Sequence, residues 1–264
     1  MKWIIRLLIA AVLIYISLVA LLYVTQRKLL YFPPSLYHAP PDWMKEVRSK
    51  DGSLSWWAAP ERDTAPVVMV FHGNASSIDS LSYIFRELKA EGYGILSLGY
   101  PGYPGNEDGT ATQETLTQAA IAQYDHIISR GIAPERIVFY GTSLGSGVAS
   151  QLASQRQPRL LILDAPFQST EAIAQSNMPI IPISLLMKDT YRSDLALQRL
   201  DMPLIWMHGQ LDRVIPLSSG QALYDEYSGP KSMHIFEGAA HHNTWFHGGQ
   251  AVVMEALADL EAEM

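Results

Sequence analysis

The sequence predicts an α/β protein in which a mostly parallel sheet is covered by helices on both faces and preceded by one transmembrane helix. Three observations lead to this fold class. Short apolar runs without polar alternation recur along the chain, as is typical of strands buried on both faces. Segments with helical spacing separate these runs. The N-terminal region also contains an apolar stretch long enough to cross a bilayer.

Composition limits the kinds of partner. The 264 residues are 48% hydrophobic, which suffices for a large buried core. Lysine and arginine number 19 against 26 acidic residues, and residues 1–28 hold four of the basic ones and no acid. The remaining body is therefore acidic, which disfavours nucleic acid because phosphate backbones are bound mainly by lysine and arginine. Without cysteine, the chain can form no disulfide, no zinc–thiolate site and no cysteine nucleophile.

The first element is the apolar run 7–24, interrupted only by Ser17 and flanked by basic residues on both sides. As a helix it spans about 27 Å, close to the hydrocarbon thickness of a bilayer. We expect an uncleaved membrane anchor over residues 1–28, with a cleaved signal peptide and a buried core helix as the alternatives. The charge before the run favours a cytoplasmic N-terminus, which puts the large domain on the extracytoplasmic side.

Residues 29–264 are expected to form one domain, entered through a proline-rich linker that ends near residue 41. The predicted parallel strands are 67–71, 94–98, 137–140, 160–163, 204–207 and 233–236. The predicted helices are 81–90, 121–128, 148–152, 222–227 and 251–264. Residues 51–60 are expected to add antiparallel strands at one edge of the sheet.

An insertion at about 167–200 interrupts the alternation of strands and helices. It contains the apolar run 178–187, in which Pro179 and Pro182 preclude a regular helix. Two interpretations stay open. The run packs against the core, or it forms a small cap that supplies apolar walls to a ligand site.

A Gly-x-Ser-x-Gly motif directly follows the predicted strand 137–140 and precedes a helical stretch. Strand, sharp turn and helix in this order form a nucleophile elbow, which exposes a strained serine above the sheet. Gly141 and Gly145 are expected because side chains there would collide with neighbouring strands and with the helix. Ser143 is therefore the candidate nucleophile, the alternative being a serine that only caps the helix.

A serine hydroxyl needs a nearby base, and the base needs a group that orients it. On this architecture the expected chain order is serine, acid, histidine. Asp212, just after a predicted strand, is the candidate acid, and Asp164 is its rival. His241 is the candidate base because it completes a Gly-x-x-His turn, and His242 is the alternative base.

Acyl transfer also requires hydrogen-bond donors for the oxyanion of the tetrahedral intermediate. The backbone N–H of Leu144, directly after the nucleophile, is the first candidate. Asn74, in the loop after strand 67–71, is the second, whereas the neighbouring His72 is expected to be structural. The C-terminal histidines lack the spacing or carboxylates of a metal site, so we expect no metal and no cofactor.

Several motifs together resemble the membrane-anchored α/β-hydrolases of the fungal bud-emergence type and their animal abhydrolase-domain relatives. The matching segments are 72–75, 99–105, 141–145, 165–167, Pro179 and Pro182, 208–216 and 238–241. The resemblance covers nearly the whole chain and implies the α/β-hydrolase fold, with Ser143, Asp212 and His241 as nucleophile, acid and base. It departs where the family shows His-Asn-Asp, because a second histidine, His242, is inserted here.

These observations favour a membrane-anchored serine hydrolase that cleaves a carboxylic ester or thioester through an acyl-serine intermediate. The anchor and the apolar run 178–187 point to a small-molecule or lipid-like acyl substrate. Two alternatives stay open. One is a serine peptidase or amidase with the same triad, and the other is a non-catalytic membrane-bound scaffold, because fold alone does not establish activity.

Overall fold

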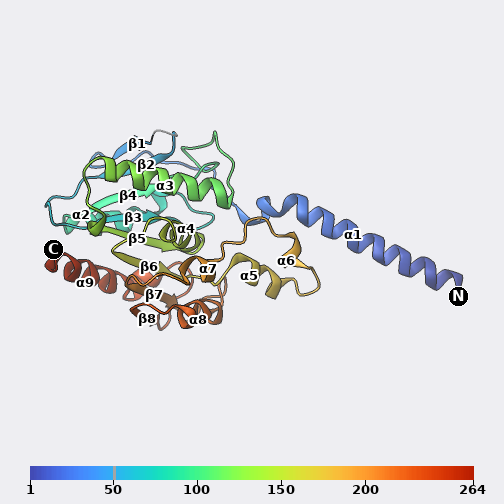
Figure 1. The fold of residues 1–264 in the computed structure, drawn as a ribbon. Coiled ribbons are helices and arrows are strands. Elements are labelled where there is room, and N and C mark those ends of the chain that lie inside the picture. Colours follow the sequence, from blue (N-terminus) through green and yellow to red (C-terminus); the bar gives the residue numbers. More distant parts are fainter. Residues whose placement is uncertain (50–51) are drawn as a thin grey trace.

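The structure, a computed structural model, describes residues 1–49 and 52–264. Within these residues, eight strands form one sheet in the order β1-β2-β4-β3-β5-β6-β7-β8 (Figure 1). They are β1 Lys45–Arg48, β2 Leu54–Ala58, β3 Val67–Phe71, β4 Gly94–Leu98, β5 Ile137–Thr142, β6 Leu160–Asp164, β7 Leu204–Gly209 and β8 Lys231–Phe236. The strands from β3 to β8 pair in parallel, while β1 and β2 pair antiparallel at one edge.

Each of the six predicted parallel strands is confirmed, and β3 shows why most of their residues are apolar. Val67, Met69 and Phe71 join the core on one face of the sheet. Val68 and Val70 join a second core on the other face. A strand covered on both sides has no solvent-facing position, so it shows no polar alternation.

Helices cover both faces of the sheet, as predicted. The helices of the body outside the 167–200 insertion are α2 Ser82–Ala90, α3 Gln113–Ser129, α4 Leu144–Ala153, α8 Leu217–Glu226 and α9 Gly249–Ala262, with short 3₁₀ turns η1 Ile78–Leu81, η2 Pro134–Arg136 and η3 Thr244–His247. Apolar residues of α3 and α4 belong to one core, and those of α2 and α9 belong to the other. The sheet is thus the middle of three layers.

The antiparallel edge predicted at 51–60 is confirmed for β2, whereas residue 51 lies outside the described residues. The sequence did not predict β1, a four-residue strand that pairs with β2 and carries three charged side chains. Because an edge strand has one unpaired side exposed to solvent, its polar composition hides it from a search for apolar runs.

Helix α1 (Lys2–Leu30) projects away from the body, with its N-terminus far from the sheet (Figure 1). By length and composition it can cross a membrane, and none of its residues is buried against the protein. A core helix would be largely buried, so that alternative is wrong. The helix continues past residue 28 to Leu30, and Tyr31 then enters the core.

The insertion contains three short helices, α5 Thr170–Asn177, α6 Ile183–Leu186 and α7 Ser193–Leu197. Helix α5 ends before Pro179 and α6 starts after Pro182, so no regular helix runs through 178–187, as predicted. The side chain of Gln175 bridges the turn by binding the backbone carbonyl oxygen of Ile181 and the backbone N–H of Ile183.

Candidate active site

Ser143 lies at the sharp turn between β5 and α4, with a φ of 52° in the left-handed region that non-glycine residues rarely occupy. A Cβ on Gly141 would overlap the backbone of Gly145, and a Cβ on Gly145 would overlap the carbonyl oxygen of Phe71 in β3. Both glycines are therefore required for α4 to pack this closely against the sheet. The turn holds Ser143 at the carboxyl edge of the parallel strands, where such folds bind ligands.

Three predicted side chains come together at this edge. His241 Nε2 lies 2.8 Å from Ser143 Oγ, and His241 Nδ1 lies 2.7 Å from Asp212 Oδ2. A carboxylate can only accept, so Nδ1 carries the proton and Nε2 is free to accept one from the serine hydroxyl. This protonation state is the one that a general base requires.

The carboxylate of Asp212 is buried and fully hydrogen-bonded. Its Oδ1 accepts from the backbone N–H groups of Val214 and Ile215, at 2.8 and 2.9 Å. His208 Nε2 lies 3.3 Å from Oδ2 and 3.0 Å from the carbonyl oxygen of Ile215. Burial alone would raise the pKa of Asp212, but hydrogen bonds from His208 and His241 hold that pKa well below its ordinary value. Asp212 therefore stays ionised beside His241.

The rival acid, Asp164, makes different contacts. Its Oδ2 accepts from the hydroxyls of Thr244 and Tyr140, at 2.6 and 3.1 Å, and its backbone carbonyl accepts the N–H of Ser143. Burial raises the pKa of Asp164 despite these bonds. Asp164 thus supports the turn at Ser143 through its backbone, and the hydrogen bonds of the described residues do not join it to His241.

The alternative base, His242, is exposed and packs edge-on against the ring of His241 at 4.5 Å between centroids. Partial burial, with a smaller contribution from His241, lowers the pKa of His242. Of the two neighbouring histidines, only His241 bonds to both the serine and the acid.

The two candidate oxyanion donors flank the serine. Leu144 is the first residue of α4, and Asn74 follows Gly73, whose Cα lies beside Ser143. Within the described residues neither backbone N–H has a hydrogen-bond acceptor, so both are available to a ligand. The Asn74 side chain is occupied elsewhere, because it donates to the carbonyl of Leu30 and accepts from the N–H of Phe32.

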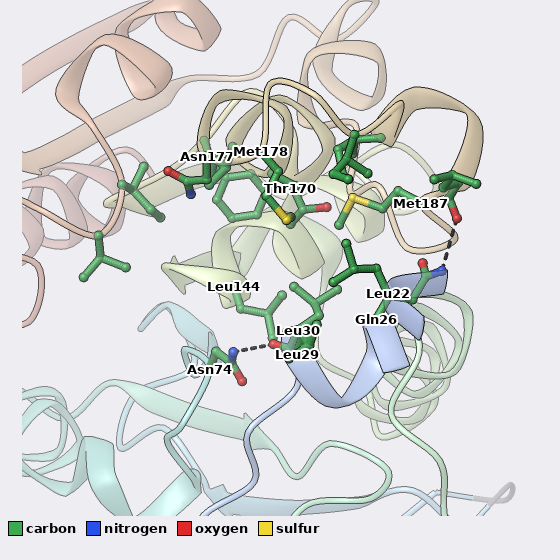
Figure 2. Close-up of a pocket in the computed structure, with 18 of the residues that line it drawn as sticks. Leu22, Gln26, Leu29, Leu30, Asn74, Leu144, Thr170, Asn177, Met178 and Met187 are labelled. Carbon is green, nitrogen blue, oxygen red and sulfur yellow. Dashed lines mark hydrogen bonds between the residues drawn. The ribbon is translucent and has the colours of Figure 1, made fainter. Parts of the chain in front are cut away.

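A cavity of about 330 Å³ opens above Ser143, at the lower end of the range for small-molecule sites. Its walls come from three parts of the chain: the body, the insertion and the end of α1. Figure 2 shows Leu29 and Leu30 of α1 close to Leu144, with Thr170 and Met178 of the insertion across the cavity. Most of the lining is apolar.

Sequence reasoning missed residues that hydrogen-bond to the acid and to the loop that contains Asn74. His208 gives no pattern that separates it from a core histidine, although it lies four residues before the candidate acid Asp212. The 99–105 run forms a turn, from which Tyr100 binds the carbonyl of His72 and Tyr103 binds the Asn74 side chain, both at 2.9 Å. The repeated Gly-Tyr-Pro was visible in the sequence, but the groups that its two tyrosines bind lie elsewhere in the chain.

Comparison with known proteins agrees with this fold. Residues 62–192 match the model of the serine aminopeptidase S33 family. The solved acetyl xylan esterase from Paenibacillus sp. R4 superposes with a TM-score of 0.67 at 17% identity, covering 90% of this chain and 93% of that one. The chain has the α/β-hydrolase fold.

Among its relatives, this α/β-hydrolase is 29% identical to an uncharacterized protein of Mycobacterium tuberculosis, over 88% of this chain and 85% of that protein. It is 26% identical to the lysophosphatidylserine lipase ABHD12 of Danio rerio, over 75% of this chain. It spans only 56% of that lipase. The animal abhydrolase-domain relatives that the sequence resembles are therefore among its matches.

Proposed function

We propose that this α/β-hydrolase is a membrane-anchored serine esterase that cleaves an acyl ester or thioester, with Ser143 as nucleophile, His241 as base and Asp212 as acid. One observation carries the proposal. The Ser143 hydroxyl, the two nitrogens of His241 and the Asp212 carboxylate lie in one hydrogen-bonded row at the floor of an apolar cavity.

The proposed reaction follows from which of these groups carry a proton. His241 Nε2 takes the hydroxyl proton as Ser143 Oγ attacks the acyl carbonyl, and the ionised Asp212 stabilises the imidazolium that forms. The N–H groups of Leu144 and Asn74 bind the oxyanion, and His241 then returns the proton to the leaving group. Water hydrolyses the acyl-serine by the same steps, with His241 again as base.

The substrate class follows from the cavity and from the anchor. An apolar lining favours an acyl chain over a sugar or a peptide, and α1, which lines the cavity, is long and apolar enough to cross a membrane. The activity named for the zebrafish relative, a lysophosphatidylserine lipase, belongs to the same chemical class. We propose a single-chain acyl lipid as substrate and, from the charge flanking α1, an extracytoplasmic catalytic domain.

Labelling with a fluorophosphonate tests the nucleophile. The proposal predicts that the wild-type protein is labelled and that Ser143→Ala is not, while Ser154→Ala, exposed just after α4, is labelled like wild type. An unlabelled but folded wild-type protein would favour the non-catalytic scaffold.

The peptidase alternative has one specific observation in its favour, since the matching family model is described as a serine aminopeptidase. Hydrolysis of p-nitrophenyl butyrate and of aminoacyl p-nitroanilides by the same preparation decides between them. We expect kcat/KM for the ester to exceed that for the anilides by at least about a hundredfold. The reverse order would identify an amidase.

A further inference from the structure

The cavity above Ser143 is bounded on one side by the membrane anchor. Leu22, Gln26, Leu29 and Leu30 of α1 line it, opposite residues of α5 and α6. Leu22 and Leu29 are separated by roughly 10 Å along the helix axis, given the rise of 1.5 Å per residue. The cleft therefore follows the anchor away from Ser143, toward the part of α1 that would lie in the bilayer (Figure 2).

Specific contacts fix the anchor against the insertion. Gln26 donates from Nε2 to the carbonyl of Leu186 at 3.1 Å and accepts at Oε1 from the N–H of Lys188 at 2.7 Å. Arg27 Nε lies 2.9 Å from Asp189 Oδ2, whose carboxylate is nearly fully buried. An anchor that served only as a tether would need none of these bonds.

The charges on the two segments mark a common boundary. Along α1, residues 7–26 carry no charge, and Arg27 is the first charged side chain after them. In the insertion, residues 172–187 carry no charge and Lys188 and Asp189 follow. Because Arg27 pairs with Asp189, and Lys188 Nζ lies 4.2 Å above the ring of Tyr23, the uncharged parts of both segments lie on the same side of one plane.

The insertion reaches deep along the anchor on that side. The Tyr15 hydroxyl donates to the carbonyl of Ile180 at 2.7 Å, and Tyr15 lies in the middle of the apolar run. From Val24, the end of that run, Tyr15 is about 13 Å further along the axis. Ile180 and Leu185 are 74% and 83% exposed, although such large apolar side chains are costly to leave in water.

We infer that residues 172–187 enter the same leaflet as the C-terminal half of α1, and that the cleft between them is the acyl-binding site, loaded from the bilayer. This inference rests on the proposed function and extends it by making the anchor one wall of the site. The part of the ligand held there is an uncharged acyl chain, because no charged side chain lines the cavity among the described residues. The ester group then lies at Ser143.

Neighbouring residues on α1 provide a matched test. Leu22 lines the cleft, whereas Leu21 is 59% exposed and lines no part of it. Full-length wild type, Leu22→Trp and Leu21→Trp are compared for kcat/KM on monomeric p-nitrophenyl acetate, butyrate, hexanoate and octanoate. In the wild type each methylene buried in the cleft should raise kcat/KM up to roughly fourfold, which corresponds to about 0.8 kcal/mol.

The expected result is that the octanoate-to-acetate ratio falls at least tenfold in Leu22→Trp and stays at the wild-type value in Leu21→Trp. Ala174→Trp, which fills the cleft from α5, should lower the ratio as well. Fluorophosphonate labelling of Ser143 in each variant confirms that it is folded. Labelled variants with a wild-type ratio would overturn the acyl cleft, whereas an unlabelled wild type would overturn the proposed function instead.

The depth of the insertion is measured separately. Because the chain lacks cysteine, Ile180→Cys and Ser129→Cys each give a single site for bimane labelling in lipid vesicles. Doxyl-labelled lipids should quench bimane at position 180 strongly and leave position 129, at the end of α3, unquenched. Equal quenching at both positions, or none at position 180, would show that residues 172–187 stay outside the bilayer.

Discussion

Ser143 can attack a carbonyl only if its proton has an acceptor, and the two adjacent histidines differ in whether they offer one. His241 is buried between Ser143 and Asp212, while His242 is exposed and has no bond to either. The inserted histidine left the base uncertain at the level of sequence, since both lie in the same turn. The two candidates differ in the direction of their side chains, which cannot be derived from spacing alone.

Replacing the two histidines separately gives unequal losses. We expect His241→Ala to lower kcat/KM for p-nitrophenyl butyrate by at least about a thousandfold, because the serine then loses its proton acceptor. His242→Ala should stay within about threefold of wild type. If His242→Ala were the slower variant, the assignment of the base would be wrong.

His72 makes folding stability depend on pH. It is fully buried, and burial lowers the pKa of His72 to about 4 from its ordinary 6.5. Between these values the unfolded chain binds a proton that the folded protein does not. The free energy of unfolding is therefore not reduced by His72 above pH 6.5. As the pH falls toward 4, it decreases by on the order of 3 kcal/mol.

Urea unfolding of the detergent-solubilised protein at pH 7 and pH 4.5 measures this effect. We expect His72→Asn to lose less free energy of unfolding between the two pH values than wild type does. The control His126→Asn, on the surface of α3, should lose as much as wild type. The raised pKa of Asp164 acts in the opposite direction but is common to all three proteins. Equal losses in all three would contradict the role of His72.

Strands were predictable where burial on both faces requires a run of apolar residues in the sequence. The apolar runs of β3 to β7 identify strands, and the glycines at 141 and 145 identify the elbow, whereas only Phe236 is buried in the edge strand β8. Helices α5 to α7 were harder to predict, because short helices between prolines show no periodicity over a useful window. It could not predict that Asn74 holds the end of α1, a contact between residues 44 apart in sequence.

Gly145 tests the packing of the elbow. Gly145→Ala places a methyl group into the backbone of β3, so α4 must shift away from the sheet. We expect a loss of about 2 kcal/mol in stability and at least a tenfold loss in kcat/KM, because the turn also sets the direction of Ser143. Ser154→Ala, exposed just after α4, is the control. An active and stable Gly145→Ala would show that the turn tolerates a wider separation.

At the scale of the whole molecule, α1 is a candidate membrane anchor that packs against the body beside Ser143. Its sequence predicts a membrane span, and its lack of buried residues fits that role. Its packing against the insertion could not be predicted, because the polar contacts lie between segments about 160 residues apart. The sequence therefore indicated only a membrane tether. The structure shows in addition that α1 forms one wall of the cavity.

Intact-protein mass and membrane extraction test the anchor. We expect purified protein to retain residues 1–28 and to stay with membranes after washing with alkaline carbonate, because an apolar run of this length partitions stably into a bilayer. A soluble chain that starts after residue 24 would identify the segment as a cleaved signal peptide.

The acyl-enzyme itself is the most direct measure of the proposed mechanism. The protein is mixed with p-nitrophenyl octanoate, quenched in acid within the first turnover and digested for peptide mass spectrometry. The mechanism predicts one octanoyl group on the peptide that carries Ser143, and none in the same peptide of Ser143→Ala. Rapid release of p-nitrophenol with no acyl group on Ser143, or with the group on another residue, would contradict it.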